Sequence, residues 1–118
     1  MFTVYQIQPT KAERDRVNAE GWAVLQENSM ERMRAKQDMQ LHGAEAYEPW
    51  MKKYYYAVAT VDADSLNEVF HLTNLWNEPE RVNKMSDRMH SVSVGDMIFD
   101  GKNFHIVDDY GFTKLEAA

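Results

Sequence analysis

The residues best suited to chemistry gather in one segment, residues 88–101, whose sequence is RMHSVSVGDMIFDG. A guanidinium, an imidazole, two hydroxyls and a carboxylate follow one another there, on Arg88, His90, Ser91, Ser93 and Asp96. If the segment is a strand, Ser91 and Ser93 share one face, because strand side chains alternate with a period of two. The polar side chains then either bind a ligand or form a structural lock, in which Asp96 accepts turn amides and Arg88 pairs with a carboxylate. The lock is the favoured interpretation.

Nucleophilic catalysis has no recognisable pattern in this chain. No G-x-S-x-G motif occurs, and no serine has a base at a readable spacing. Carboxylates are plentiful, but nothing singles out one pair for acid–base work. The sequence therefore favours a protein without enzymatic activity and assigns no catalytic residue. The alternative is a small hydrolase or transferase that uses Asp96, His90 or Arg88. It requires these side chains to converge at a pocket beside a carboxyl group with a raised pKa.

Metal-binding patterns are equally weak. The four histidines are His42, His71, His90 and His105, and none has a second histidine four positions on or an H-E-x-x-H motif. One arrangement remains, in which His105 joins Asp108 and Asp109 if the turn folds back. The chain has no cysteine, which excludes disulfides, thiolate zinc sites and thiol nucleophiles. We predict neither a metal nor another cofactor.

The elements that position these groups are those of one small domain. A chain of 118 residues fits a single domain, residues 1–118, with one core. The lack of cysteine suits a reducing cytoplasm. No signal peptide is recognisable at the N-terminus, and the longest apolar run, residues 54–61, is far shorter than the ~20 residues that span a bilayer. We expect a cytoplasmic protein without a membrane segment.

The charge is unevenly distributed along the chain. The net charge is −6, and residues 1–59 balance eight acids with eight bases, so the excess lies in residues 60–118. An acidic half disfavours binding to phosphate backbones and favours a protein partner. Nucleic-acid binding stays open as a second alternative, and it needs a basic stripe. The residues that could supply one are Arg32, Arg34, Lys36, Lys52 and Lys53.

The first half of the chain predicts a strand and two helices. The strand covers residues 2–7, with imperfect alternation of apolar and polar residues. Thr10 and Glu13 form a capping box for a helix over 11–20 that ends at Gly21. A longer helix with methionines on its apolar face is expected over 29–47, opened by Ser29 and ended by Pro49.

The second half predicts a strand, a helix and a β-meander. Residues 54–61 are the strongest strand signal, and Ser65 with Glu68 caps a short helix after it. Residues 74–90 are expected to be irregular. Strands over 91–94, 97–99, 104–107 and 112–115 follow, with a two-residue hairpin turn at Asp100-Gly101. The predicted class is α+β, an antiparallel sheet of four or five strands packed by two or three helices.

Three tryptophans bear on partners. Trp76 lies in a polar segment, so it either fills the core or is exposed and binds a partner. The first interpretation is favoured. If Trp22, Trp50 or Trp76 is exposed, a homodimer is expected, because exposed aromatic side chains concentrate in interfaces.

Two stretches of the chain resemble a group of small bacteriophage proteins of unknown activity. Residues 88–115 carry R-x-x-S-x-S-x-G-D, then D-G-K, F-H-I-V and Y-G-F-T-K-L, and residues 57–74 resemble the group's strand-then-helix unit. The resemblance implies a phage-encoded accessory protein that acts in the bacterial cytoplasm. The group's pattern corresponds here to Arg88, Ser91, Ser93, Gly95 and Asp96, and to Asn74 in the upstream unit. His90 stands where the pattern is unconstrained. We expect a non-enzymatic protein that binds and modulates a host or phage protein.

Overall fold

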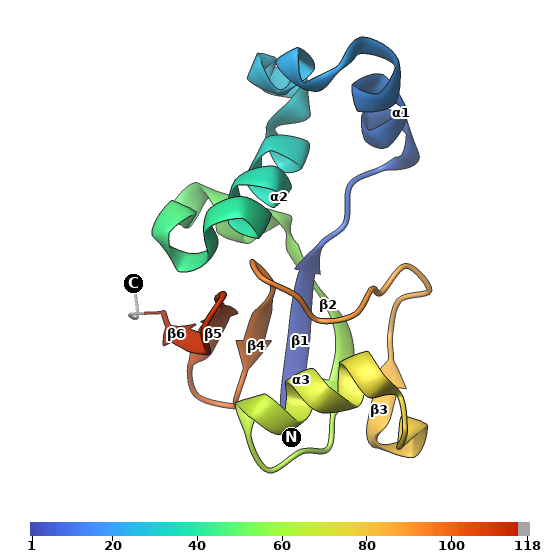
Figure 1. The fold of residues 1–118 in the computed structure, drawn as a ribbon, viewed down its shortest axis with the longest axis vertical. Helices are drawn as coiled ribbons and strands as arrows, with labels where there is room; N and C mark the ends of the chain where they lie inside the picture. The colour runs from blue at the N-terminus through green and yellow to red at the C-terminus, as the bar shows by residue number, and fades with distance from the viewer. Residues whose placement is uncertain (116–118) are drawn as a thin grey trace.

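Six strands form one sheet in the computed structural model, which describes residues 1–115 (Figure 1). They are β1 (Phe2–Ile7), β2 (Tyr55–Val61), β3 (Val82–Lys84), β4 (Met97–Phe99), β5 (Phe104–Val107) and β6 (Phe112–Lys114). Their order is β3-β2-β1-β4-β5-β6, and every neighbouring pair is antiparallel. The α+β class is confirmed, with slightly more strands than expected. The short edge strand β3 accounts for part of the excess, since it lies in the segment that was expected to be irregular.

Three α-helices accompany the sheet: α1 (Lys11–Glu20), α2 (Glu31–His42) and α3 (Leu66–Leu75). Short 3-10 helices cover Trp22–Gln26, Asn28–Met30, Gly43–Ala46, Pro49–Tyr54 and Pro79–Arg81. The Thr10 capping box and the Ser65 cap are both present. α2 is shorter than the expected 29–47. It begins without a side-chain cap from Ser29, and it ends at Gly43, whose φ of 60° leaves the helical region before Pro49 is reached.

The two faces of the sheet carry separate cores, because neighbouring strand residues point to opposite faces. One face is covered by α3 and by the loop that follows β3 (Figure 1), and its core includes Val4, Val69 and Val92. The other core joins α2 and the 3-10 segments after it to one end of the sheet, and it includes Ile7 and Met39. Gln6 lies on the same side of β1 as Val4, and its amide contacts the loop over residues 90–96 at His90 and Asp96.

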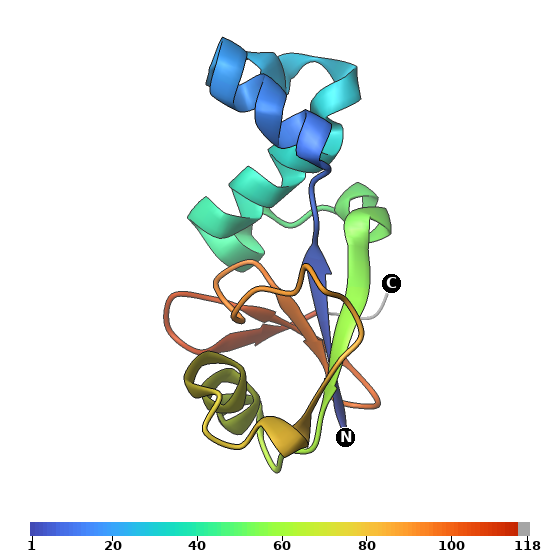
Figure 2. The ribbon, with the colours of Figure 1, turned by 90° about the vertical axis from the view of Figure 1, so that its right-hand side faces the viewer.

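A small helical lobe projects beyond the sheet (Figure 2). α1, the 3-10 segments after it and the start of α2 form this lobe around a core of their own, which contains Val17, Val24, Leu25 and Met30. The molecule is elongated as a result, with its longest dimension at 42 Å. Among residues 1–115, no helix has both the length and the apolar character needed to cross a bilayer. At the junction between this lobe and the sheet, the end of β1, α1, α2 and the loop after β3 come together.

Candidate functional site

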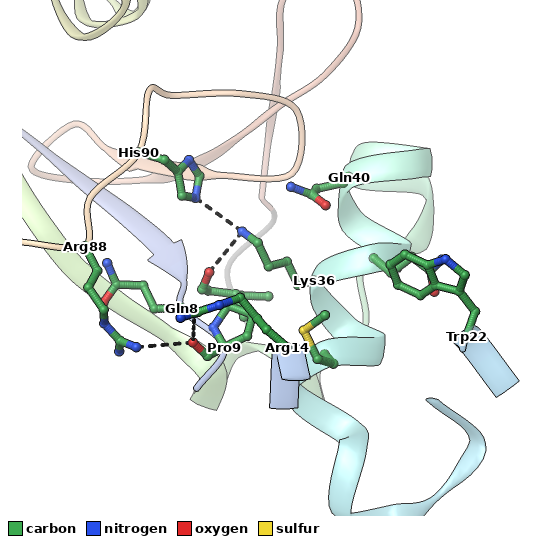
Figure 3. Close-up of a pocket in the computed structure, with 11 residues that line it drawn as sticks. Gln8, Pro9, Arg14, Trp22, Lys36, Gln40, Arg88 and His90 are labelled. Atoms are coloured by element: carbon green, nitrogen blue, oxygen red, sulfur yellow. Dashed lines mark hydrogen bonds between the residues drawn. The ribbon is translucent and has the colours of Figure 1, made fainter. Parts of the chain in front are cut away.

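A cavity of about 240 Å³ lies at this junction (Figure 3). We call it the cationic cavity, because its charged lining consists of Arg14, Lys36 and Arg88, and no Asp or Glu lines it. The rest of its lining is His90, the glutamines 8, 37 and 40, and the apolar residues Ile7, Pro9, Trp22 and Met33. The lining comes from the end of β1, from α1 and α2, and from the loop after β3. The chain has a net charge of −6, so the positive charge here is a local excess, and a second cavity, lined by Lys52, Lys102 and Lys114, has the same character.

Two guanidinium groups converge on one backbone carbonyl in this cavity. The oxygen of Pro9 accepts a hydrogen bond from Nη1 of Arg14 at 2.8 Å and another from Nη1 of Arg88 at 3.2 Å (Figure 3). Within residues 1–115, neither arginine is within 4.0 Å of a carboxylate oxygen, whereas Arg16, Arg32 and Arg81 all are. The two positively charged guanidiniums are therefore held near each other by the neutral carbonyl of Pro9. The expected pairing of Arg88 with a carboxylate is wrong.

Lys36 reaches the same region from α2. Its ammonium donates to the oxygen of Ile7 at 3.1 Å and to Nε2 of His90 at 3.2 Å. Since Nε2 accepts, the proton of a neutral His90 lies on Nδ1, which donates to the oxygen of Ser91 at 2.9 Å. Burial lowers the pKa of Lys36, and the nearby charge of Asp96 opposes that shift. Burial also lowers the pKa of His90, against the opposing effect of its bond to Ser91, and the positive charge of Lys36 lowers it further.

Gln6 connects the loop to the sheet with a fully buried amide. Its Nε2 donates to the oxygen of His90 at 2.8 Å and to Oδ2 of Asp96 at 3.0 Å, and its Oε1 accepts from the backbone N–H of His90 at 3.2 Å. Both amide hydrogens and the amide oxygen are thus used, which explains how so polar a group is tolerated without exposure. Gln6 holds the backbone at position 90 and the carboxyl at position 96 at the same time.

Asp96 stands behind the cavity and does not line it. Only 4% of it is exposed, and its Oδ2 accepts the N–H of Ser93 at 3.0 Å as well as the Gln6 amide. Burial raises the pKa of Asp96 to about 7, although the Ser93 amide, the charge of Lys36 and the Gln6 amide oppose the shift. Asp96 accepts a turn amide, as the lock interpretation expects. Its carboxylate is also 3.9 Å from Nδ1 of His90, so the lock contains two groups that titrate.

The other residues singled out from the sequence have structural contacts. Residues 90–96 form a loop and not a strand, so the expected polar stripe of Ser91 and Ser93 does not exist. Gly95 accepts a hydrogen bond from the Tyr55 hydroxyl at 2.5 Å and has a φ of 93°. Asn74 ties α3 to the loop by donating to the oxygen of Val92 at 3.1 Å.

Trp76 does not fill the core as expected. It ends α3 in the left-handed region with a φ of 52°, and 36% of it is exposed. The cationic cavity therefore brings together Arg88 and His90 from the sequence candidates, with Asp96 directly behind them, while Asn74 and Trp76 lie outside it.

The structure meets part of the condition that the enzyme alternative requires, which is convergence of Asp96, His90 and Arg88 at a pocket beside a carboxyl group with a raised pKa. Arg88 and His90 share the cavity, and the pKa of Asp96 is raised. However, Asp96 is buried and does not line the cavity, and both ring nitrogens of His90 are already hydrogen-bonded. The cavity lining contains no serine, threonine, tyrosine or carboxylate. The arrangement provides positive charge and shape, but it offers no nucleophile beside a free base.

The basic stripe required for nucleic-acid binding is divided in the structure. Arg32 pairs with Glu13 at 3.3 Å and Lys53 pairs with Glu31 at 3.2 Å. Arg34 donates to the oxygen of Leu25, and Lys36 belongs to the cationic cavity. Lys52 lines a different cavity, together with Lys102 and Lys114. The five residues named from the sequence therefore do not present one row of free charge, which is what binding to a phosphate backbone requires.

The candidate metal arrangement is also divided. His105 bonds through Nε2 to Oδ2 of Asp100 at 2.8 Å, on the hairpin loop. Asp108 instead accepts the backbone N–H of Ala44 at 2.8 Å and the hydroxyl of Thr113. In the described part of the chain, no three His, Asp or Glu side chains are grouped so that they could hold a metal ion.

Sequence reasoning missed most of the site. Neither Gln6 nor Arg14 was singled out from the sequence, and Lys36 was considered only as part of a basic stripe. The only local signal was the polar Gln6 at an inward position of β1, two residues after Val4, where an apolar residue is expected. A buried polar residue in such a place usually has a dedicated set of partners.

The raised pKa of Asp96 predicts a specific pH dependence. An aspartate titrates at 3.8 when unperturbed, and the folded protein holds this proton up to about pH 7. The folded state therefore binds more protons in this window, so the contribution of Asp96 to stability is greatest below pH 4 and decreases as the pH rises to 7. Asp96→Asn removes that titration. We expect the stability of the variant relative to the native protein to increase by about 3–4 kcal/mol from pH 4 to pH 8.

Urea unfolding of both proteins from pH 4 to pH 8 measures the difference in their free energies of unfolding. The titration of most other carboxylates affects both proteins equally and cancels in this difference. His90 acts in the opposite sense, because its lowered pKa removes stability as the pH falls below 6.5. Lys36 is the other charged group that faces Asp96, and its positive charge lowers the pKa of Asp96. A difference between the two proteins that does not vary with pH would show that Asp96 is ionised in the folded state at pH 4.

No family model, curated protein or solved structure matches the chain.

Proposed function

We propose that the chain is a non-enzymatic binding protein that docks on another protein through the cationic cavity and modulates it. The observation that carries the proposal is the composition of that cavity, which has three cationic side chains and no carboxylate. Such a site is prepared to receive negative charge from outside the chain.

The hydrogen bonds around the cavity support binding over catalysis. Asp96, Gln6, Lys36 and His90 are connected in a chain of contacts that fixes the loop against β1 and α2. Each of these groups is already satisfied by another part of the protein. A side chain that is held in this way supplies a rigid surface, whereas acid–base chemistry needs a group that is free to exchange its proton with a substrate.

The size of the cavity supports a protein partner over a small-molecule ligand. Its volume is about 240 Å³, below the range of roughly 300–1,000 Å³ that is usual for small-molecule sites. A recess of this size suits one or two side chains of a larger partner. Trp22 lines it and is 58% exposed, and tryptophan and arginine are the residues that most often dominate binding energy at protein interfaces.

The proposed setting is a bacterial cytoplasm during phage infection, where the partner is a host or phage protein. The resemblance of residues 57–74 and 88–115 to small phage proteins supports this setting. The lack of cysteine is compatible with it.

The proposal predicts that tagged protein retains one bacterial protein in stoichiometric amount from a lysate, under gentle salt. The Arg14→Gln/Arg88→Gln double variant should lose this partner, because two of the three cations of the cavity are then neutral. Lys84→Gln is the matched control, since Lys84 is exposed on the edge strand β3 and lies outside the cavity. The control should retain the partner as the native protein does.

Two outcomes would contradict the proposal. One is the repeated recovery of nothing, and the other is a partner that the double variant retains as well as the native protein does. Recovery of a second, untagged copy of the chain through the same arginines would identify a homodimer as the docked state, which the exposure of Trp22 favours among the three tryptophans. Circular dichroism of each variant confirms that it is folded.

A further inference from the structure

We infer that the segment received by the cationic cavity is an acidic peptide in which a Glu or Asp carboxylate binds between Arg14 and Arg88 and an apolar neighbour packs beside Trp22 and Met33. The inference rests on the proposed function, and it names the chemistry of the partner. Charge complementarity is its first support, because the cavity gathers cations of this chain without a carboxylate among its lining residues.

The two arginines are close enough to share one carboxylate. Their Nη1 atoms are 2.8 Å and 3.2 Å from the same Pro9 oxygen, and the sum of these distances is the largest separation that the two nitrogens can have. A guanidinium has five N–H donors, and the Pro9 oxygen engages one on each arginine. The remaining donors can form charge-assisted hydrogen bonds to a carboxylate, which are shorter and stronger than bonds to a neutral carbonyl.

The position of Pro9 fixes the geometry before any ligand arrives. Pro9 is buried, and it is the residue before the N-cap of α1, so its carbonyl cannot move without moving the helix. Arg14 reaches it from the first turns of α1, and Arg88 reaches it from the loop after β3. Both arginine residues are exposed, and the hydrogen bond of each to Pro9 orients the two guanidiniums toward one point before an anion binds.

The remaining lining distinguishes a peptide from an isolated anion. Ile7, Pro9, Trp22 and Met33 give the cavity an apolar wall, which a phosphate or a free carboxylate alone would leave uncovered. Methionine adapts its shape to different apolar partners, and an exposed tryptophan offers a broad contact surface. The acidic residues of this chain lie mainly in residues 60–118, whereas most of the cavity comes from the electrically balanced residues 1–59. An acidic partner therefore meets less repulsion at this face than at surfaces that carry the chain's excess of acidic residues.

The test uses a blocked pentapeptide with the sequence Gly-Leu-Glu-Leu-Gly, acetylated and amidated so that its only charge is the glutamate. Amide and tryptophan indole resonances of the full chain are followed by NMR during titration. We expect shifts at residues 14, 22, 36 and 88. Replacing the peptide glutamate by glutamine, or making Arg14→Gln or Arg88→Gln in the protein, should weaken binding by about tenfold or more. Lys84→Gln should leave the affinity unchanged.

The inference is overturned if the glutamine peptide binds as well as the acidic one, if the shifts fall outside the cavity, or if no shift occurs at saturating peptide. A free organic acid, 3-phenylpropionate, forms the second arm. If it shifts the same resonances at lower concentration than the peptide does, the site takes small organic acids and the peptide inference is wrong. If a partner from the lysate binds only when both arginines are present and the peptide titration fails, this inference is wrong and the proposed function is still supported.

Discussion

Gly95→Ala is expected to destabilise the fold by roughly 3–5 kcal/mol, a large part of the 5–15 kcal/mol by which a domain of this size is usually stable. A Cβ atom at this position would lie 2.7 Å from the backbone carbon and oxygen of Met39, near the end of α2. These are backbone atoms of a buried helical residue, so no side-chain rotation relieves the overlap. Urea unfolding followed by tryptophan fluorescence measures the loss.

Gly101→Ala separates the two causes of this loss. Gly101 has a φ of 99°, close to the 93° of Gly95, but an added Cβ would meet no atom within 4 Å. The control variant therefore reports only the conformational strain of a positive φ, which is about 1–2 kcal/mol. Equal losses at the two glycines would mean that the loop over 90–96 moves freely away from α2, and the close contact would then have no importance for the fold.

The same glycine shows what the sequence could and could not predict. Gly95 belongs to the R-x-x-S-x-S-x-G-D pattern, and local chemistry correctly predicted the Thr10 capping box and the Ser65 cap. It also predicted the hairpin between β4 and β5, but the loop there covers residues 100–103 and is not the expected two-residue turn. Each of these depends on residues a few positions apart, whose propensities act before any tertiary contact forms. The requirement for glycine at position 95 depends on Met39, 56 positions earlier, and no local pattern contains it.

The loop over 90–96 shows why local alternation failed. Ser91 to Val94 alternate polar and apolar side chains as a strand does, yet the chain there pairs with no strand. The carbonyl of Val92 instead accepts the Asn74 amide from α3, and the N–H of Ser93 donates to the Asp96 carboxylate. Side chains thus form hydrogen bonds with backbone groups that would otherwise pair with a neighbouring strand. Asn and Asp side chains compete with regular secondary structure in this way. The cavity is unpredictable for the same reason, since its members meet only through the tertiary fold.

Gln6→Leu is expected to cost roughly 3–4 kcal/mol, because several polar groups lose their partner at once. Leucine has nearly the size of glutamine, so the loss reports hydrogen bonds and not an empty space. The backbone N–H and carbonyl of His90 would lack the contacts at 3.2 Å and 2.8 Å, and Asp96 would keep the Ser93 amide alone. The Gln6 amide also holds down the pKa of Asp96, so the variant should show that pKa raised further.

Gln8→Leu is the matched control for this prediction. Gln8 is also a glutamine with a hydrogen-bonded amide, donating to the Ser86 hydroxyl at 3.1 Å, but it is partly exposed. Water can replace the Ser86 contact, so the expected loss is below about 1 kcal/mol. If Gln6→Leu proved no more costly than Gln8→Leu, the buried amide would not be what fixes the loop. The fold would then not hold Arg88, just before that loop, beside the Pro9 carbonyl. The preformed pair of guanidiniums, from which the docking of an acidic partner is argued, would have no structural cause.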